Sequence, residues 1–355
     1  MTTSGTRYLF CRPHGGLNDT LVQLELCRRH AARFGRTMIV DLSRSGLRLP
    51  FDEVFVARAD FGAPVLSMTP DLARVLDGIE SVRPSEVAGR VSSYAAEWDV
   101  QADCTTERQS GVRVTFDFDR DHPETLIVHE EAGGGTRGFG FLRDVALAPA
   151  MADAIARRLI PLGRDYDAIH VRNTDLSTDY VALFANCRRL FAGRRLLVCS
   201  DSAEVKAYAA RVFADSTILS AADIPDLPGL PLHATRGTDP RKTAVDLLCD
   251  LFAIARSSNF VFTTVRSRGG TRPGFSGFSV LADMLRQQPA VVRGLLARAD
   301  PALLSVLFET PPPHRRAGGI RHMLARLDQW RWNFPAQRLS TRLGAKLRGG
   351  TLFSG

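Results

Sequence analysis

From residue 167 onward, short apolar runs alternate with amphipathic segments of helix length. The runs are DAIHV (167–171), RLLVCS (195–200) and NFVFTT (259–264), and the segments between and after them include 179–191, 202–214, 243–257 and 278–285. Each run has the length of a buried strand, and strands that alternate with helices indicate a parallel sheet with helical crossovers. We therefore predict an α/β domain in this part of the chain.

The N-terminus repeats this pattern. Residues 8–12 read as a strand, the polar turn HGGLND (14–19) follows, and apolar residues at near-helical spacing from Leu21 to Phe34 lead to Gly35 and a second strand, TMIVD (37–41). This is a βαβ unit, although its glycines do not form the GxGxxG fingerprint. The turn offers backbone amides at a helix N-terminus, where an anion could bind, and makes Gly15, Gly16 and Asn18 candidates for anion binding.

The chain of 355 residues suits two domains. We predict an α/β fold with two Rossmann-like domains facing a cleft, at 1–155 and 156–312, and a basic helical tail at 313–355. Between 61 and 150 the signal is weaker: VTFDFD (114–119) and TLIVHEE (125–131) read as strands, and AGGGTRGFGF (132–141) as a loop that is either a plain turn or closes on a ligand.

The net charge of +8 is concentrated in the tail. Residues 314–355 hold nine Lys or Arg and a single acid, Asp328, whereas the rest of the chain is balanced. Leu339, Leu343 and Leu347 recur every fourth residue among basic side chains, a pattern that suits an anionic membrane surface. The alternative is a helix that packs on the body; we assign packing to 320–334 and the membrane, or a loose conformation, to 336–350.

Other features point to the cytoplasm. The six cysteines stand singly, several inside apolar runs, which favours buried thiols over a disulfide framework or a zinc site. The N-terminus lacks the layout of a signal peptide, and no stretch has the length of a membrane-spanning helix. We expect a cytoplasmic protein, peripheral at the inner membrane surface if the tail binds lipid, with no nucleic-acid partner.

The strand at 167–171 ends in polar groups. The two-residue period of a strand places His170 and Arg172 on one side, and Asp175 follows just beyond. The planar guanidinium of an arginine suits phosphate oxygens, while the alternative is a salt bridge at the strand end.

Further polar groups lie near the ends of the next strands or on the helix between them. Asp201 follows RLLVCS, as a ligand group or as a helix cap, and the GFSGFS turn places Ser276 and Ser279 at the start of a helix. Asp246 lies on the apolar helix at 243–257, where it could pair with Arg172, bind a ligand hydroxyl or face solvent. The loop before the GFSGFS turn holds Arg266, Arg268 and Arg272, so the turn and these arginines together suit a diphosphate; the alternative is that the arginines are flexible surface residues.

Taken in order, HVRNTD, LLVCSD and AVDLLCDLFAIARSSNFVFTT with a downstream serine resemble the three C-terminal motifs of the GT-B fucosyltransferases, which include α1,6-fucosyltransferases, bacterial nodulation fucosyltransferases and protein O-fucosyltransferases. HGGLND resembles their glycine-rich opening turn. The resemblance covers 11–41 and 168–285.

The resemblance implies inverting, metal-independent transfer of a sugar, usually fucose, from a GDP-sugar to a hydroxyl of an oligosaccharide or lipid-linked glycan. Arg172 would bind the diphosphate and stabilise the charge on departing GDP, and His170 and Asp246 would position the donor or Arg172. Asp201 and Ser276 or Ser279 would complete the nucleotide site.

The catalytic base is open at this point. Some relatives have a glutamate a few residues beyond the first motif, and Asp179 lies near that place; Asp19, Glu130 and Glu131 are rivals. Two other functions fit the same residues: a nucleotide-sugar-binding protein without turnover, and an unrelated Rossmann-like enzyme that uses another phosphorylated ligand.

Overall fold

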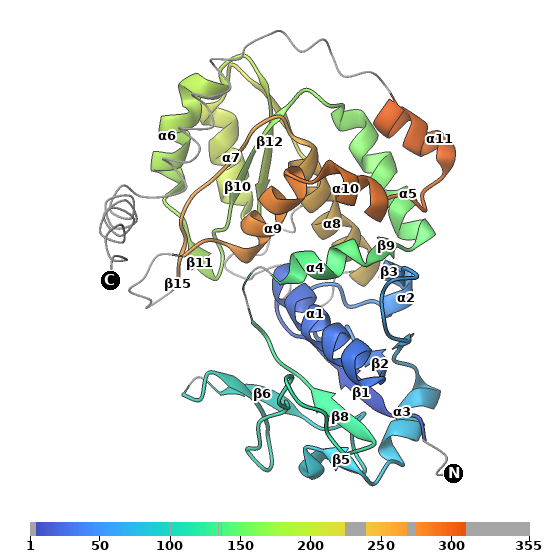
Figure 1. Cartoon of the computed structure of the whole chain (residues 1–355). Coiled ribbons are helices and arrows are strands. Elements are labelled where there is room, and N and C mark those ends of the chain that lie inside the picture. Colours follow the sequence, from blue (N-terminus) through green and yellow to red (C-terminus); the bar gives the residue numbers. More distant parts are fainter. Residues whose placement is uncertain are drawn as a thin grey trace, which may run out of the picture.

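The protein consists of two halves, each built around a parallel sheet (Figure 1). The computed structural model describes residues 5–99, 101–133, 135, 137–223, 239–267 and 274–309. The basic tail, the connection IPDLPGLPL (224–232) and the arginines at 268 and 272 lie outside the described residues.

The N-terminal half contains a five-stranded sheet in the order β4-β2-β1-β8-β5. Its neighbouring strands all pair in parallel. Its strands are β1 (Tyr8–Cys11), β2 (Thr37–Val40), β4 (Val65–Ser67), β5 (Val82–Arg83) and β8 (Leu126–His129). The other elements of this half are α1 (Leu17–Phe34), α2 (Phe51–Val54), β3 (Phe55–Ala57), α3 (Pro70–Asp77), η1 (Ser85–Val87), β6 (Ala96–Asp99), β7 (Cys104–Glu107), α4 (Gly138–Arg143) and β9 (Val145–Leu147).

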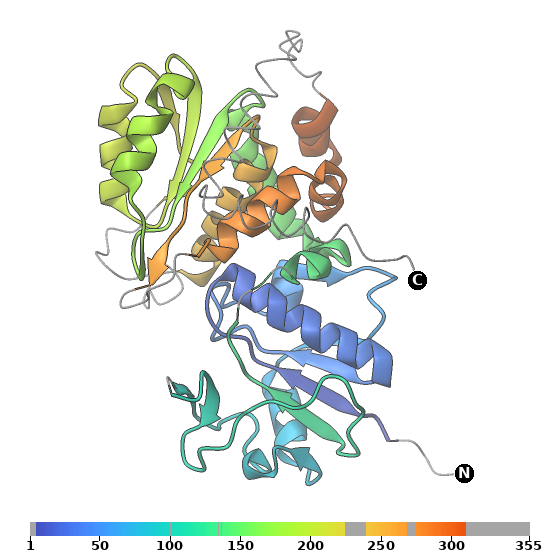
Figure 2. The same cartoon turned by 60° about the vertical axis from the view of Figure 1, so that its left-hand side comes forward.

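Side chains alternate between the two faces of this sheet. Leu9 and Cys11 of β1 pack with the apolar side of α1, whereas Phe10 lies in a second core with Leu76 of α3. Figure 2 shows α1 lying across one face of the sheet. Helix α1 ends at Gly35, which adopts the left-handed conformation (φ 64°) that a helix stop favours.

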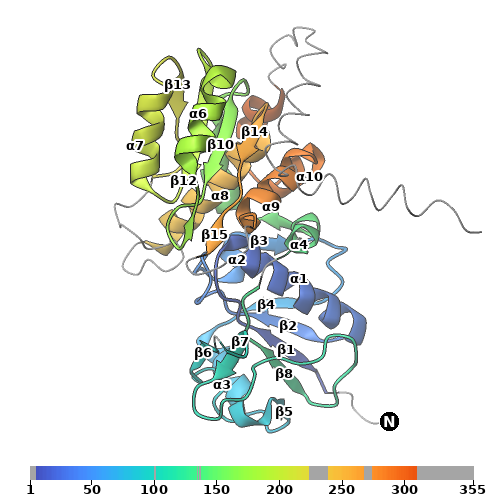
Figure 3. The ribbon, with the colours of Figure 1, turned by 90° about the vertical axis from the view of Figure 1, so that its left-hand side faces the viewer.

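The C-terminal half contains a four-stranded parallel sheet in the order β13-β12-β10-β14 (Figure 3). Its strands are β10 (Asp167–Val171), β12 (Arg195–Ser200), β13 (Thr217–Leu219) and β14 (Phe260–Phe262). The remaining elements are α5 (Pro149–Leu159), η2 (Ile160–Leu162), β11 (Leu176–Ser177), α6 (Tyr180–Phe191), α7 (Ala203–Val212), α8 (Pro240–Arg256), β15 (Arg266–Ser267), α9 (Gly277–Arg286), α10 (Pro289–Leu295), α11 (Pro301–Leu304) and η4 (Ser305–Glu309).

Two layers of helices cover this second sheet. Ile169 and Val171 of β10 face α6 and α7, while Ala168 packs in the core that includes α8 and α9. By the same alternation, His170 and the residue after the strand, Arg172, point towards the α8–α9 side. The fold thus carries the polar end of β10 to the side on which the site forms.

Most predicted elements are confirmed, with two errors. Residues 114–119 form no strand; their alternation arises because Phe116 and Phe118 pack against the ring of His30, with ring centroids 4.7 and 6.1 Å away. The end of the predicted loop at 132–141 is the start of α4. The predicted boundary at 155/156 falls inside α5, which packs against α8.

All six cysteines are buried and free, as predicted. Among the described residues, no helix is both long and apolar enough to cross a membrane.

Candidate functional site

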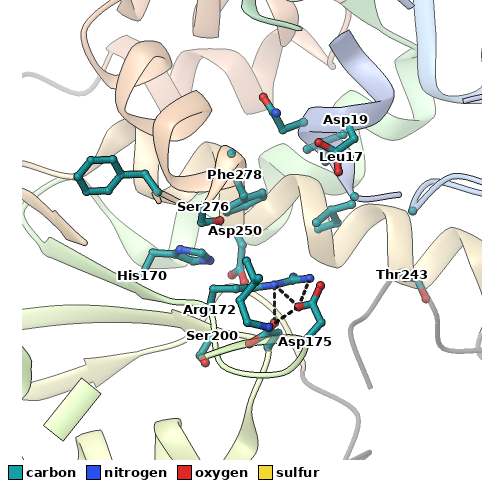
Figure 4. Close-up of a pocket in the computed structure, with 18 of the residues that line it drawn as sticks. Leu17, Asp19, His170, Arg172, Asp175, Ser200, Thr243, Asp250, Ser276 and Phe278 are labelled. Atoms are coloured by element: carbon teal, nitrogen blue, oxygen red, sulfur yellow. Dashed lines mark hydrogen bonds and ion pairs between the residues drawn. The ribbon is translucent and has the colours of Figure 1, made fainter. Parts of the chain in front are cut away.

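A cavity of about 420 Å³ lies where the carboxyl ends of β10 and β12 face the start of α1 (Figure 4). Ligands of open parallel sheets bind at this edge, beyond the carboxyl ends of the strands. Both halves contribute to its lining: Gly16, Leu17, Asn18, Asp19, Gly46 and Gly135 from the N-terminal half, and His170, Arg172, Asp175, Leu176, Ser200, Asp201, Thr243, Leu247, Asp250, Phe275, Ser276, Gly277 and Phe278 from the C-terminal half.

His170 is a neutral side chain in the wall of this cavity, and its neighbours hold it in place. Its Nδ1 is 2.7 Å from Ser279 Oγ, and its ring lies 5.0 Å from the ring of Phe278. Burial, together with the charge of Arg172, lowers the pKa of His170 to about 3. At neutral pH the ring is therefore uncharged and can accept or donate a hydrogen bond, but it does not supply a positive charge.

Arg172 is the charged centre of the site. Its Nε lies 2.8 Å from Asp175 Oδ1 and 3.1 Å from Asp201 Oδ2. Asp201 is buried and fixed by Asn173 N (2.8 Å) and by the hydroxyl of Thr174 (2.6 Å), whereas the side chain of Asp175 is 41% exposed. The buried carboxylate of Asp201 thus holds the guanidinium in place, whereas the carboxylate of Asp175 is in reach of solvent and of a ligand.

Two helices begin at the cavity. Gly16 caps α1 and Ser276 caps α9, and both residues line the cavity. Their first-turn amides and helix dipoles favour an anion between them. The close approach depends on Gly277, because a Cβ there would lie 2.6 Å from Asn18 Nδ2.

Two carboxylates of the cavity have raised pKa values. Burial raises the pKa of Asp19, in the first turn of α1, to about 6, and the positive charge of Arg172 works in the opposite direction. Gly15 (φ 84°) forms the turn before α1, and a Cβ there would lie 3.0 Å from Asp19 Oδ2. Asp19 therefore faces the cavity from the N-terminal half as a carboxylate that can take up a proton near neutral pH.

Asp250 is the second of these carboxylates. It lies on α8 in the wall of the cavity, and burial raises its pKa to about 6. Its Oδ1 is buried and has no hydrogen-bond partner among the described residues. A buried oxygen without a partner is costly, so this atom is suited to accept a hydrogen bond from a ligand.

No protein-family model and no curated protein sequence matches the chain. Solved structures do. Two structures of the α-1,6-fucosyltransferase NodZ, one soaked with GDP-fucose and one co-crystallised with GDP, match with a TM-score of 0.50 at 16% and 18% identity, and the alignments cover 79% of this chain and 92% of theirs. The chain has a fucosyltransferase-like fold. A variant of Arabidopsis thaliana FUT1 in complex with GDP matches more weakly, with a TM-score of 0.45 and 11% identity over 79% of this chain and 68% of that one.

The structure brings most of the predicted site residues together. Seven of them line the cavity: Gly16, Asn18, His170, Arg172, Asp175, Asp201 and Ser276. Gly15 and Ser279 are not among the lining residues, but each adjoins one: Gly15 precedes Gly16 in the turn before α1, and Ser279 Oγ lies 2.7 Å from His170 Nδ1. That Asp175 and Asp201 both pair with Arg172 shows that the expected salt bridge and the expected cavity coexist.

Other predicted residues lie elsewhere. Of the three alternatives for Asp246, neither the pair with Arg172 nor exposure to solvent is found: the residue is buried, and Arg158 of α5 and Lys242 hold its carboxylate, the latter at 2.8 Å. Asp179 is exposed and outside the cavity lining; its carboxylate caps α6 by accepting from Ala182 N at 3.0 Å.

Glu130 and Glu131 are likewise committed to ion pairs. Arg12 Nε lies 2.8 Å from Glu130 Oε2, and Arg113 Nε lies 2.9 Å from Glu131 Oε1. Burial opposes ionisation of Glu130, but hydrogen bonding from His14 and the charge of Arg12 lower its pKa to about 2. A carboxylate with so low a pKa is a weak proton acceptor, which counts against Glu130 as a base.

Sequence reasoning missed Asp250 and Phe278. Asp250 follows Asp246 by four residues, so both lie on one side of α8, and both are buried. They differ in their surroundings, because Arg158 and Lys242 hold Asp246 whereas Asp250 lines the cavity, and the sequence did not show this. Within the described part of the chain, no cluster of three or more His, Cys, Asp or Glu side chains is arranged to hold a metal ion.

Proposed function

We propose that the protein is an inverting glycosyltransferase of the GT-B arrangement that transfers fucose from GDP-fucose to a hydroxyl group of a glycan or lipid-linked glycan. The fold supports this proposal, as does the cavity between the two halves. The observation that carries it is the buried Oδ1 of Asp250, which has no hydrogen-bond partner among the described residues and belongs to the wall of the same cavity as Arg172 and two helix N-termini.

Asp250 supports guanine as the base of the nucleotide. Guanine presents two adjacent donors, N1–H and the 2-amino group, which one carboxylate can accept together. Adenine places an acceptor beside its amino group, and uracil flanks its N–H with two carbonyl oxygens. Because Asp250 is buried, a base that left it unpaired or opposed it with an acceptor would bind much more weakly.

Arg172 and the starts of α1 and α9 suit the diphosphate. Asp201 keeps the guanidinium in place, and we propose that the diphosphate replaces the exposed carboxylate of Asp175 on its outer side. In the reaction, the bond between the anomeric carbon and the β-phosphate oxygen breaks, and its electron pair leaves with GDP. Arg172 and the helix N-termini stabilise the negative charge that develops there.

Asp19 takes the place of Asp179 as the proposed base. The acceptor oxygen forms the new bond to the anomeric carbon on the face opposite GDP, and its proton passes to Asp19. Asp19 lies across the cavity from Arg172 (Figure 4). A pKa of about 6 leaves it ionised at neutral pH, yet basic enough to accept a proton as the acceptor attacks.

The nucleotide assignment is tested by calorimetry with GDP, ADP and UDP, each with and without Mg²⁺. We expect GDP to bind most tightly, and Arg172→Ala to lose at least tenfold in affinity for it. Binding of ADP or UDP in preference to GDP would refute GDP-fucose as the donor. If GDP binds but neither transfer nor hydrolysis of GDP-fucose is detected across a broad glycan panel, the protein is a nucleotide-sugar-binding protein instead.

A further inference from the structure

The β6–β7 hairpin of the N-terminal half carries an exposed tryptophan, Trp98. The two strands form a separate two-stranded sheet in which Trp98 lies opposite Thr105. Trp98 is 43% exposed, whereas Ala96 and Thr105, on the same face of the hairpin, are buried. Trp98 therefore extends past the part of this face that the body covers, although tryptophan side chains are usually well buried.

The hairpin is tied to two loops that line the cavity. Arg44 donates from Nη2 to Ala96 O (3.0 Å), and Gly46, two residues later, lines the cavity. Thr105 N donates to Glu131 Oε2 (3.0 Å), and Gly135, four residues later, also lines it. Along the path through Arg44, Trp98 lies within about 25 Å of the cavity wall, from ordinary backbone and side-chain dimensions.

The views agree on where the hairpin stands. In Figures 1 and 3, β6 lies at the margin of the N-terminal half, on the side where β15 lies in the C-terminal half. Strand β11 pairs with β15. Residue Leu176 of β11 itself lines the cavity. A chain-like ligand that leaves the cavity on this side would pass along the hairpin.

The exposed ion pair of the hairpin lies on the face opposite Trp98. Glu97 is adjacent to Trp98 in β6, so its side chain points to the other face, where it pairs with Arg108 at 3.0 Å. The group that the hairpin offers on the face of Trp98 is therefore the indole ring. A pyranose ring has an apolar face of C–H groups that stacks on such an aromatic ring.

We propose that Trp98 is a stacking platform for a distal sugar unit of an oligosaccharide acceptor whose terminal unit reaches Asp19. The inference rests on the proposed sugar transfer, since it is the acceptor that must extend from the cavity. An isolated two-stranded hairpin is only marginally stable. Here hydrogen bonds with Arg44 and Glu131 hold the hairpin in the position that this role requires. The acceptor is thereby an oligosaccharide of several units rather than a single sugar.

The test uses the full chain saturated with GDP and an array of immobilised glycans of one to six units, built from hexoses and N-acetylhexosamines. We expect the wild type to bind only the longer glycans, and Trp98→Ala to lose at least tenfold in affinity for them while retaining its affinity for GDP. Trp98→Tyr, which keeps an aromatic ring, should retain most of the wild-type affinity for the longer glycans. Leu190→Ala is the matched control, since Leu190 is 45% exposed on α6 of the other half.

Three results separate the possibilities. Equal glycan binding by the wild type and Trp98→Ala, or no glycan binding by a wild type that binds GDP, overturns the platform. Glycan binding that depends on Trp98 in a protein that does not bind GDP supports the platform and refutes the proposed donor. In turnover assays, the platform requires a raised KM for long acceptors with kcat unchanged.

Discussion

At the scale of single residues, the site is defined by two carboxylates that burial has made unusually basic. Asp19 and Asp250 both have pKa values raised to about 6 and both line the cavity, but they belong to different halves of the protein. Pairs of titratable groups with displaced pKa values often divide the work of a site between them. Here the division we propose is proton acceptance for Asp19 and base recognition for Asp250.

Asp250→Asn should weaken GDP binding roughly 10- to 100-fold, because it replaces a charged acceptor with an amide that opposes one guanine donor with its own N–H. In the proposed recognition it is the ionised form of Asp250 that binds guanine, so affinity of the wild type should fall as the pH decreases below about 6, by up to tenfold per pH unit. The variant should lose this dependence. Calorimetry between pH 5 and 8 measures both effects.

The control for this experiment is Asp246→Asn, one turn earlier on α8. Its carboxylate is held by Arg158 and Lys242 outside the cavity, so the variant should keep the affinity and the pH profile of the wild type. If both variants bind GDP as the wild type does, Asp250 does not read the base.

Asp19→Asn should lower kcat by roughly 10²- to 10⁴-fold with little change in GDP affinity, because it removes a base without removing a group that binds the nucleotide. With saturating donor, the kcat of the wild type should fall tenfold per pH unit below about 6, where Asp19 becomes protonated. Asp179→Asn is the comparison. If that variant lost turnover and Asp19→Asn did not, Asp179 rather than Asp19 would be the catalytic base.

At the scale of secondary-structure elements, the site depends on how closely two helix N-termini approach each other. Helices α1 and α9 come from different halves, and their first turns meet at the contact between Asn18 and Gly277. This contact closes one wall of the cavity and directs both helix dipoles towards the same volume. The proposed anion site therefore requires this close approach, which can be tested independently of catalysis.

Gly277→Ala should destabilise the protein by about 1–3 kcal/mol, because its Cβ would overlap the amide of Asn18. Urea denaturation measures this loss. The control, Gly274→Ala, has no atom within 4 Å of its Cβ and should be nearly neutral. In the double variant with Asn18→Ala, much of the loss should be recovered; strictly additive effects would show that the two residues do not interact.

The elements that sequence patterns predicted are those with long, regular periodicity. Strand β10, strand β12 and helix α8 were each visible, and with them His170, Arg172 and Asp201. By contrast, β5 has only two residues, Val82 and Arg83, and its place in the sheet comes from pairing with β8, which is distant in the sequence. Such short strands have no periodicity of their own to detect.

The positions of the site residues show the same difference between what local patterns predict and what tertiary packing decides. The strand period placed His170 and Arg172 on one side correctly, but the choice between Asp246 and Asp250 depends on how α8 lies against β12, which is a matter of packing. Asp179 is close to Arg172 in sequence, yet the chain turns there and uses its carboxylate to cap α6. Local patterns locate strand ends, whereas tertiary packing decides which polar groups share a cavity.

At the scale of the whole molecule, the stability of the fold should depend on buried neutral histidines. His129 at the end of β8 is buried, and hydrogen bonds join its Nδ1 to Thr115 Oγ1 and its Nε2 to Gln23 Oε1, each at 2.8 Å. Burial, reinforced by the charge of Arg113, lowers the pKa of His129 to about 3. Since the unfolded chain protonates this residue near its ordinary pKa, acid favours unfolding.

The sign of this effect gives a prediction for unfolding by urea as a function of pH. Because the pKa of His129 is lower in the folded protein, the stability that it contributes is complete above about pH 6.5 and is lost as the pH falls towards 3, by at most about 1.4 kcal/mol per pH unit. His129→Gln cannot be protonated, so its stability relative to the wild type should improve steadily over this range. Thr115→Val, which removes one partner but no titrating group, should lower stability by a similar amount at each pH. A constant difference between wild type and His129→Gln from pH 6.5 to 4 would show that acid unfolding starts elsewhere, in which case the buried ring of His170, whose pKa burial also lowers to about 3, is the next group to replace.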